Sequence, residues 1–230
     1  MKHLKNIYRL ARRAFKSFIG KDILIFPDCK KVKYEIHGSD YGGWPAVDDV
    51  FELNPVVYSF GVGDDITYDL SIIKKYSLNV YAFDPTPKSC EWIEKQSIPD
   101  ELHFYNYGIS DYDGEENFIA PENDSFVSYS AVKSGEGISL KVKKLSTVMK
   151  ELNHNTVDVL KMDIEGGEYK VVDDFINENI KPKILLIEFH HRFPEVGLNK
   201  TKDTIAFLKS QGYCIFYVSA NGEEVGFIIK

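Results

Sequence analysis

The chain has 230 residues, of which 43% are hydrophobic and 13% aromatic, so it can fill the core of one globular domain. This composition excludes an intrinsically disordered chain, a collagen-like repeat and a disulfide-stabilised mini-protein. The longest wholly aliphatic stretch, 184–187, is far shorter than the roughly 20 apolar residues that a membrane-spanning helix needs.

The charge is distributed unevenly along the chain. The net charge is −7, but residues 1–20 hold six basic side chains and no acidic one: Lys2, Lys5, Arg9, Arg12, Arg13 and Lys16. Taking these six from the 28 basic residues leaves 22 against 35 acidic residues, a net charge of −13 for the rest of the chain. Because an acidic body repels phosphate backbones, we expect no nucleic-acid partner.

The three cysteines are dispersed. Cys29, Cys90 and Cys214 lie far apart in the sequence, and no two have the CxxC spacing. We therefore expect neither a disulfide framework nor a zinc–thiolate site, and we expect a reducing compartment. This predicts a cytoplasmic protein, either free or peripheral to the inner face of the membrane.

The first predicted element is an amphipathic helix over 4–19. On a helical wheel of about 100° per residue, one face carries Leu4, Ile7, Tyr8, Ala11, Ala14, Phe15, Phe18 and Ile19, and the six basic residues lie on the other. Charges interrupt the stretch throughout, so it is not a secretory signal. Two interpretations stay open: the helix docks on an anionic membrane surface, or it packs against its own acidic domain or a partner subunit.

A glycine- and aromatic-rich segment, 39–45, precedes the first predicted strand. It contains Tyr41, Gly42, Gly43, Trp44 and Pro45. The composition is typical both of a loop that folds over a pocket and of an ordinary turn anchored by an aromatic side chain.

From residue 56 onward, apolar β-rich runs alternate with helical periodicity. The predicted strands are 56–60, 79–83, 102–107, 157–162 and 183–189, and the predicted helices are 65–76, 86–96, 168–179 and 202–211. This alternation predicts an α/β fold with a mostly parallel sheet and helices on both faces.

The predicted sheet ends in a hairpin, because 213–218 and 225–229 flank Asn221-Gly222. Segment 113–143 is predicted to be an insertion of short strands and loops, from its turn residues Gly114, Pro121, Asn123, Gly135 and Gly137. We expect a helix over 1–20 followed by one domain over 21–230, in which 21–54 is an extension and 55–230 a Rossmann-like core.

A glycine turn follows the first predicted strand. Gly61 and Gly63 form it, and Asp84 ends the second strand 23 positions after Gly61. This pattern is typical of a nucleotide site, although a tight turn with a helix-capping aspartate would look similar. Asp64 and Asp65 at the helix start would repel a pyrophosphate but attract the sulfonium and ammonium groups of S-adenosylmethionine. The charges therefore favour S-adenosylmethionine over NAD.

Three motifs resemble those of FkbM-type methyltransferases. Residues 160–168, LKMDIEGGE, closely resemble the KxDxEGxE signature of that family. Residues 105–111, followed by Gly114, are similar to its motif after the third strand, and 184–189 with Glu188 are similar to its fifth strand. The resemblance covers about 55–230. It implies a class I methyltransferase fold of seven strands with the last antiparallel, S-adenosylmethionine as cofactor, and O-methylation of sugars or other small hydroxylated substrates.

The resemblance also implies cofactor-binding residues. Gly61 and Gly63 would lie under the methionine part, Asp84 would bind the ribose, and the adenine would be framed by Gly108, Ile109 and Ser110. Two positions depart from the common class I pattern, since Ser59 stands where an acidic residue is usual and Asp65 stands where a third glycine is usual. Asp64 or Asp65 could supply the missing carboxylate.

Titratable residues gather at the ends of the fourth and fifth parallel strands, where α/β enzymes hold their catalytic groups. They are Asp163, Glu165, Glu188, His190 and His191. We predict that Asp163 or His190 is the general base for a hydroxyl nucleophile and that Glu165 and Glu188 orient the substrate or the base. Adjacent residues of an extended chain point to opposite sides, so His191 is assigned to packing.

Two alternative roles exist for the acidic residues at these strand ends. Asp163 and Glu188 could hold Mg²⁺ that acidifies the hydroxyl, which we rank below metal-free catalysis. Glu168 fits a helix-start acid favoured by the helix dipole, so we leave it out of the chemistry.

The sequence therefore predicts an S-adenosylmethionine-dependent O-methyltransferase acting on a sugar, a glycan precursor or a similar small hydroxylated molecule. An NAD-dependent oxidoreductase and a non-catalytic binding module are the competing hypotheses. Residues 4–19 are the candidate membrane contact.

Overall fold

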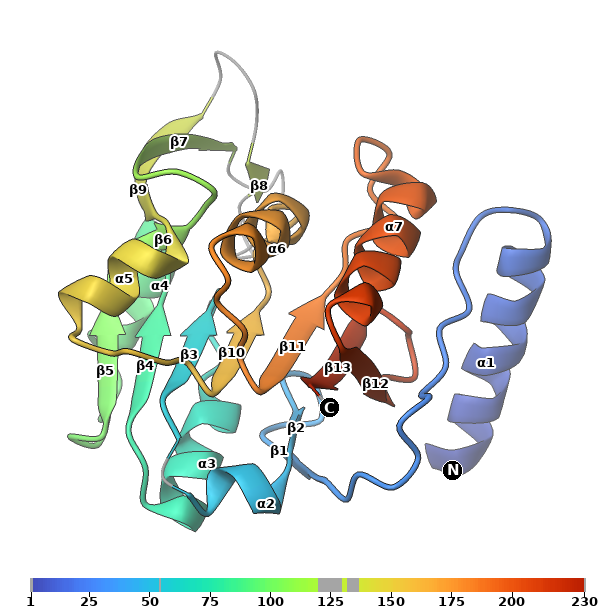
Figure 1. The fold of residues 1–230 in the computed structure, drawn as a ribbon, viewed down its shortest axis with the longest axis horizontal. Helices are drawn as coiled ribbons and strands as arrows, with labels where there is room; N and C mark the ends of the chain where they lie inside the picture. Colours follow the sequence, from blue (N-terminus) through green and yellow to red (C-terminus); the bar gives the residue numbers. More distant parts are fainter. Residues whose placement is uncertain (1, 54, 120–129, 132–136, 230) are drawn as a thin grey trace.

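A seven-stranded sheet forms the centre of the molecule (Figure 1), in a computed structural model that describes residues 2–53, 55–119, 130–131 and 137–229. Its strands run in the order β12-β13-β11-β10-β3-β4-β5. Their bounds are β3 (Val57–Phe60), β4 (Val80–Phe83), β5 (Leu102–Tyr105), β10 (Val159–Met162), β11 (Ile184–Glu188), β12 (Tyr213–Val218) and β13 (Glu224–Ile229). Strands β11, β10, β3, β4 and β5 pair in parallel, whereas β13 lies between β11 and β12 and is antiparallel to both. The predicted α/β fold with a C-terminal antiparallel hairpin is confirmed.

Helices cover both faces of this sheet. One face carries α5 (Leu145–Glu151), α6 (Glu168–Asn177) and α7 (Gly197–Ser210), and the other carries α2 (Asp48–Phe51), α3 (Thr67–Tyr76) and α4 (Pro87–Ile93). Successive strand residues enter opposite cores, as Val57 and Tyr58 of β3 do, because side chains alternate along a strand. On the α5–α7 side, Phe60 and Phe83 of neighbouring strands stack with their ring centroids 4.3 Å apart.

A second, four-stranded sheet follows the predicted insertion. It has the order β6-β9-β7-β8 and consists of β6 (Gly108–Ile109), β7 (Gly114–Ile119), β8 (Ser130–Ala131) and β9 (Ile138–Lys143). The predicted strand over 102–107 ends two residues early, at Tyr105, and residues 108–109 form a separate strand that pairs with β9. Three turn residues of the insertion, Pro121, Asn123 and Gly135, lie outside the described residues.

The N-terminal part begins with α1 (Lys2–Phe18), at one end of the molecule beside the β12 and β13 edge (Figure 1). A short hairpin of β1 (Glu35–His37) and β2 (Trp44–Ala46) then leads into the domain. Among the described residues, no helix combines the length and the apolar character that crossing a membrane would require.

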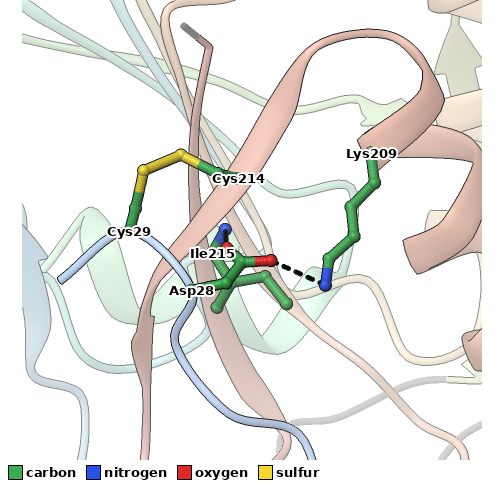
Figure 2. Close-up of a disulfide and its surroundings, with 5 residues drawn as sticks. All are labelled: Asp28, Cys29, Lys209, Cys214 and Ile215. Carbon is green, nitrogen blue, oxygen red and sulfur yellow. Dashed lines mark hydrogen bonds and ion pairs between the residues drawn. A yellow bond between two sulfur atoms is a disulfide. The ribbon is translucent and has the colours of Figure 1, made fainter.

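A disulfide joins the chain between α1 and β1 to strand β12, so the expectation that the cysteines stay unpaired is wrong for two of them. Cys29 and Cys214 are 185 positions apart, yet their Cα atoms lie 5.7 Å apart, within the usual range for a disulfide. Spacing in the sequence cannot show this proximity, which arises because the chain at Asp28 runs along β12 (Figure 2). The Ile215 N–H donates to Asp28 Oδ1 at 2.7 Å, and Lys209 Nζ pairs with Asp28 Oδ2 at 2.7 Å.

Removing this disulfide should destabilise the protein. We expect Cys29→Ser to lower the free energy of unfolding by roughly 2–5 kcal/mol, because the crosslink closes a long loop in the unfolded chain. Urea unfolding measures this effect, and Cys90→Ser, at the unpaired and half-buried cysteine, is the matched control. Thiol titration of the denatured, unreduced protein should find one reactive cysteine; three would show that no disulfide forms.

Candidate active site

A cavity opens at the carboxyl ends of the central parallel strands. It is lined by the 61–65 turn after β3, by residues 84–86 after β4, by Gly108 and Ile109 of β6, and by the segment after β10. The remaining lining residues are Tyr41, Gly42, Trp44, Phe60, Glu116, Phe118, Lys161, Asp163, Ile164, Glu165, Gly167 and Lys170. The structure thus brings together three chain segments that the sequence assigned to cofactor binding.

Six of the seven predicted cofactor-binding residues line this cavity, namely Gly61, Gly63, Asp64, Asp84, Gly108 and Ile109. Ser110 does not. Its buried hydroxyl donates to Glu116 Oε2 at 3.1 Å, and it is Glu116 that faces the cavity. Ser110 therefore acts on the cavity through a neighbour and not by direct contact.

Gly61 is required by a close contact between two strand ends. Its φ angle is +75°, a conformation that favours glycine, and a Cβ atom built on it would lie 1.7 Å from the carbonyl oxygen of Asp163. No side chain fits there. The absence of a side chain at Gly61 allows the turn after β3 to touch the start of the loop after β10.

Asp84 is held by hydrogen bonds on both carboxylate oxygens. The Gly63 N–H donates to Oδ2 at 2.9 Å, and the N–H and hydroxyl of Thr86 donate to Oδ1 at 2.9 and 2.6 Å. The side chain is buried but borders the cavity. Its carboxylate is thus fixed in orientation at the edge of the space where a ligand would bind.

Asp65 holds the 39–45 segment beside the cavity. Its Oδ2 accepts a hydrogen bond from the Ser39 hydroxyl at 2.7 Å, and its Oδ1 accepts one from the Thr67 N–H at 2.8 Å. Burial would raise the pKa of Asp65, but these hydrogen bonds outweigh it and the pKa is lowered. A Cβ atom on Gly42 would lie 2.6 Å from Asp65 Oδ2, so a side chain at this position would displace the carboxylate.

The 39–45 segment is both a turn anchored by an aromatic side chain and a loop that borders a pocket. Trp44 is buried and anchors it, while Tyr41, Gly42 and Trp44 all border the cavity. Asp65 is hydrogen-bonded to Ser39 of this segment. Of the two carboxylates in the turn, the exposed Asp64 is therefore the one that can contact a ligand.

His190 lies among three carboxylates. Its Nε2 is 3.8 Å from Asp163 Oδ1 and 3.3 Å from Glu165 Oε2, and its Nδ1 is 3.3 Å from Glu168 Oε1. Glu168 is 0% exposed, and it also accepts the backbone N–H groups of His190 and Gly166 at 2.9 Å each. Asp163, Glu165 and His190 offer potential ligand atoms within 4.8 Å of one another.

The carboxylates keep the His190 ring charged. Burial alone would lower the pKa of His190, but the hydrogen bond and charge of Glu168, with the charges of Glu165 and Asp163, raise it to about 10. With both ring nitrogens facing carboxylates, the imidazolium is a fixed cation within this acidic cluster.

Glu168 is the site residue that sequence reasoning missed. Seen in the sequence, an acidic residue at a helix start is explained by the helix dipole alone. The structure instead buries Glu168 as the partner that orients and charges His190. The available signal was its place as the last residue of the KxDxEGxE pattern.

The four predicted catalytic residues separate into two groups. Asp163 and Glu165 border the cavity, whereas His190 and Glu188 are not among its lining residues. Burial, together with the negative charges of Asp163 and Glu224, raises the pKa of Glu188 to about 9, so this carboxyl group is protonated near neutral pH. His191 points away as predicted, with its Nε2 3.0 Å from Asp22 Oδ1.

Several lining residues were not anticipated from the sequence. Lys161 is a buried strand residue whose Nζ lies 5.4 Å from the centroid of the Trp44 ring, and it is the first residue of the KxDxEGxE pattern. Lys170 pairs with Glu116 across from α6 to β7. No local pattern predicts this pair, because the inserted sheet meets α6 only in the folded chain.

The His190 charge should depend on Glu168. We expect NMR titration to find His190 protonated from pH 6 to pH 9, and we expect Glu168→Gln to lower its pKa, since a charged acceptor is lost. Glu94→Gln, at an exposed position, should leave the pKa unchanged. Because the folded pKa is raised, its contribution to stability is present below pH 6.5 and lost as the pH rises through about 10. A neutral His190 at pH 7 would contradict this account.

The chain resembles known proteins in sequence. A family model described as the Methyltransferase FkbM domain matches residues 49–215. The chain is 28% identical over 140 residues to the human protein named "Probable methyltransferase-like protein 24", a match that covers 60% of this chain and 33% of that one. The protein of the same name from Rattus norvegicus is 24% identical over 152 residues, covering 65% and 36%. The chain therefore spans about a third of the length of the curated relatives it matches.

A solved structure has a similar fold. The crystal structure of Methyltransferase FkbM from Methylobacillus flagellatus KT matches with a TM-score of 0.50 and 12% sequence identity, over 76% of this chain and 43% of that one. At this identity the likeness concerns the fold alone. Since the family model covers most of the chain, including the strands and turns that form the cavity, the chain belongs to the FkbM methyltransferase family.

Proposed function

We propose that the cavity binds S-adenosylmethionine and that the protein transfers its methyl group to a hydroxyl oxygen. The observation that carries this proposal is the charge of the lining. Two lysines, Lys161 and Lys170, face six carboxylates: Asp64, Asp65, Asp84, Glu116, Asp163 and Glu165. S-adenosylmethionine carries a sulfonium and an ammonium against one carboxylate, so this lining attracts it.

The residues present fit that cofactor. The turn with Gly61 and Gly63 leaves backbone free of side chains, which suits the methionine part, and Asp64 offers an exposed carboxylate beside it. The fixed carboxylate of Asp84 suits the ribose hydroxyls. Gly108 and Ile109 supply a small, apolar surface for the adenine.

When bound, S-adenosylmethionine supplies an electrophilic methyl group. In this account Asp163 accepts the proton of the acceptor hydroxyl as its oxygen becomes the nucleophile, which contributes roughly 10²–10⁴-fold. Of the two predicted bases, Asp163 is favoured because it borders the cavity, whereas both ring nitrogens of His190 already face carboxylates. Glu165 orients the acceptor, and the charged His190 limits the repulsion between neighbouring carboxylates.

The acceptor is proposed to be a sugar, a glycan precursor or a similar small hydroxylated molecule. The cavity lining combines the aromatic residues Tyr41, Trp44 and Phe118 with carboxylates, a mixture suited to a ligand with both apolar faces and hydroxyl groups.

The cytoplasmic location expected from the sequence stays a prediction. The Cys29–Cys214 disulfide would persist only in a compartment where thiols are oxidised.

The charges of the cavity also disfavour NAD as the cofactor and Mg²⁺ as a catalytic metal. The pyrophosphate of NAD would meet the exposed carboxylate of Asp64 at the glycine turn, where like charges oppose binding. For the magnesium alternative, Asp163 would remain a donor, but a protonated Glu188 is a poor ligand and a charged imidazolium already lies among the other donors.

Calorimetry should separate the two cofactors. We expect S-adenosylhomocysteine to bind and NAD to give no signal under the same conditions. Asp84→Asn should weaken S-adenosylhomocysteine binding about tenfold or more, because a charged acceptor for the ribose is lost. Asp100→Asn, an exposed aspartate away from the cavity, is the matched control. Saturable NAD binding without a response to S-adenosylhomocysteine would reverse the assignment.

Methyl transfer should depend on Asp163. With radiolabelled S-adenosylmethionine and an acceptor found by screening sugars and glycan precursors, Asp163→Asn should lower kcat by about 10²–10⁴-fold. Its affinity for S-adenosylhomocysteine should stay near that of the unchanged protein. Full turnover by this variant would exclude Asp163 as the base.

The metal-free mechanism is tested with the same assay. We expect EDTA to leave methyl transfer unchanged, because the proton goes to a carboxylate of the protein. Activity that is lost in EDTA and restored by Mg²⁺ would support the magnesium alternative instead.

A further inference from the structure

The described aromatic side chains of helix α1 point away from the rest of the protein. Its described aromatic side chains are exposed, at 70% for Tyr8, 65% for Phe15 and 88% for Phe18. Arg13, by contrast, is only 6% exposed. A helix that stabilised its own domain would bury the aromatic residues and expose the arginine. The described side chains therefore oppose the interpretation that α1 packs its apolar face on its own domain.

The anchor of α1 is the Arg13 guanidinium. Its Nη2 donates to the carbonyl oxygen of Ile23 at 3.1 Å. It lies directly on Gly222 in the turn between β12 and β13, where a Cβ atom would come within 1.8 Å of Nη2. Because glycine leaves room for the guanidinium there, α1 is attached through its polar side.

The chain that follows α1 is fixed to the same end of the domain. Asp22 is buried, and its two carboxylate oxygens lie 3.0 Å from His191 Nε2 and 3.0 Å from Arg192 Nη2. Arg192 also pairs with Glu223 at 2.6 Å. With the Cys29–Cys214 disulfide further along, these contacts hold the start of the extension at a defined place on the domain.

The exposed side of α1 joins apolar and basic side chains. Its described exposed residues are Tyr8, Ala11, Arg12, Ala14, Phe15 and Phe18, continued by Ile19. On a helical wheel Arg12 and the partly exposed Lys16 lie along one edge of the apolar stripe. This arrangement is typical of helices that lie in a membrane interface, with the apolar stripe among acyl chains and the cations at phosphate depth.

We propose that α1 docks this face on the surface of an anionic phospholipid bilayer. Charge complementarity favours an anionic lipid surface over a second copy of the helix as the binding partner of this face. Residues 1–20 hold six basic groups and no acidic one, so two copies of the helix would bring like charges together, whereas anionic headgroups neutralise them. The body, with its net charge of −13, is repelled by the same surface, so α1 is the part of the chain that contacts the lipid.

Sedimentation with vesicles tests this proposal on the full chain. We expect binding to vesicles of phosphatidylcholine and phosphatidylglycerol, at least about tenfold weaker binding to phosphatidylcholine alone, and weaker binding as salt is added. The double variant Phe15→Ser, Phe18→Ser should lose at least about tenfold in affinity for the anionic vesicles. Arg12→Gln with Lys16→Gln should weaken binding and reduce its salt dependence.

The matched control is Leu53→Ser, which removes a large side chain that is 72% exposed elsewhere on the molecule. It should bind vesicles as the unchanged protein does. All variants should unfold at the same temperature, because none of the substituted side chains is buried. The test does not use the methyltransferase reaction, so it can fail or succeed independently of the proposed cofactor.

Three results would overturn the proposal. The first is no binding to anionic vesicles, and the second is equal binding by the Phe15, Phe18 double variant and the Leu53 control. The third is a dimer in solution that this double variant dissociates and that vesicles do not compete with, which would make a second copy of the chain the occupant of α1.

Discussion

The contact between Gly61 and the carbonyl group of Asp163 is the constraint on which the site depends. The ends of β3 and β10 approach so closely that a side chain at Gly61 would occupy the same space as that carbonyl oxygen. This approach puts the turn proposed for the methyl donor next to the carboxylate proposed for the acceptor. Methyl transfer needs donor and acceptor in line at close range, so a packing requirement between two strands also serves the reaction.

The second constraint is that the negative charges of the carboxylates around the cavity must be compensated for the protein to stay folded. Like charges at short range destabilise a protein unless cations or protons compensate them. Here the compensation is internal, since His190 is charged among Asp163, Glu165 and Glu168, and Glu188 keeps its proton. Neither His190 nor Glu188 lines the cavity, so Asp163 and Glu165 face the space where a cationic ligand would add further compensation.

The family resemblance alone implied the lining residues Gly108 and Ile109. Local patterns in the sequence predicted the sheet, the final hairpin and the lining residues Gly61, Gly63, Asp64 and Asp84. These features depend on neighbours in the chain, such as alternating apolar residues and glycines after strands. The missed features depend on tertiary contact. Cys29 meets Cys214 only because the N-terminal chain follows β12, and Glu168 is distinguished from a surface acid only by its burial. For α1 the pattern predicted an amphipathic helix. It did not predict that the helix would bury Arg13, on its polar side, against the domain.

We propose that S-adenosylmethionine lies between the Gly61 turn and Asp163. A crystal structure of the full chain, grown with S-adenosylhomocysteine and NAD together in solution, tests it most directly. We expect S-adenosylhomocysteine in the cavity, with its sulfur atom between that turn and the Asp163 side chain and its ribose on Asp84. A dinucleotide with its pyrophosphate at the Gly61 turn would contradict the account.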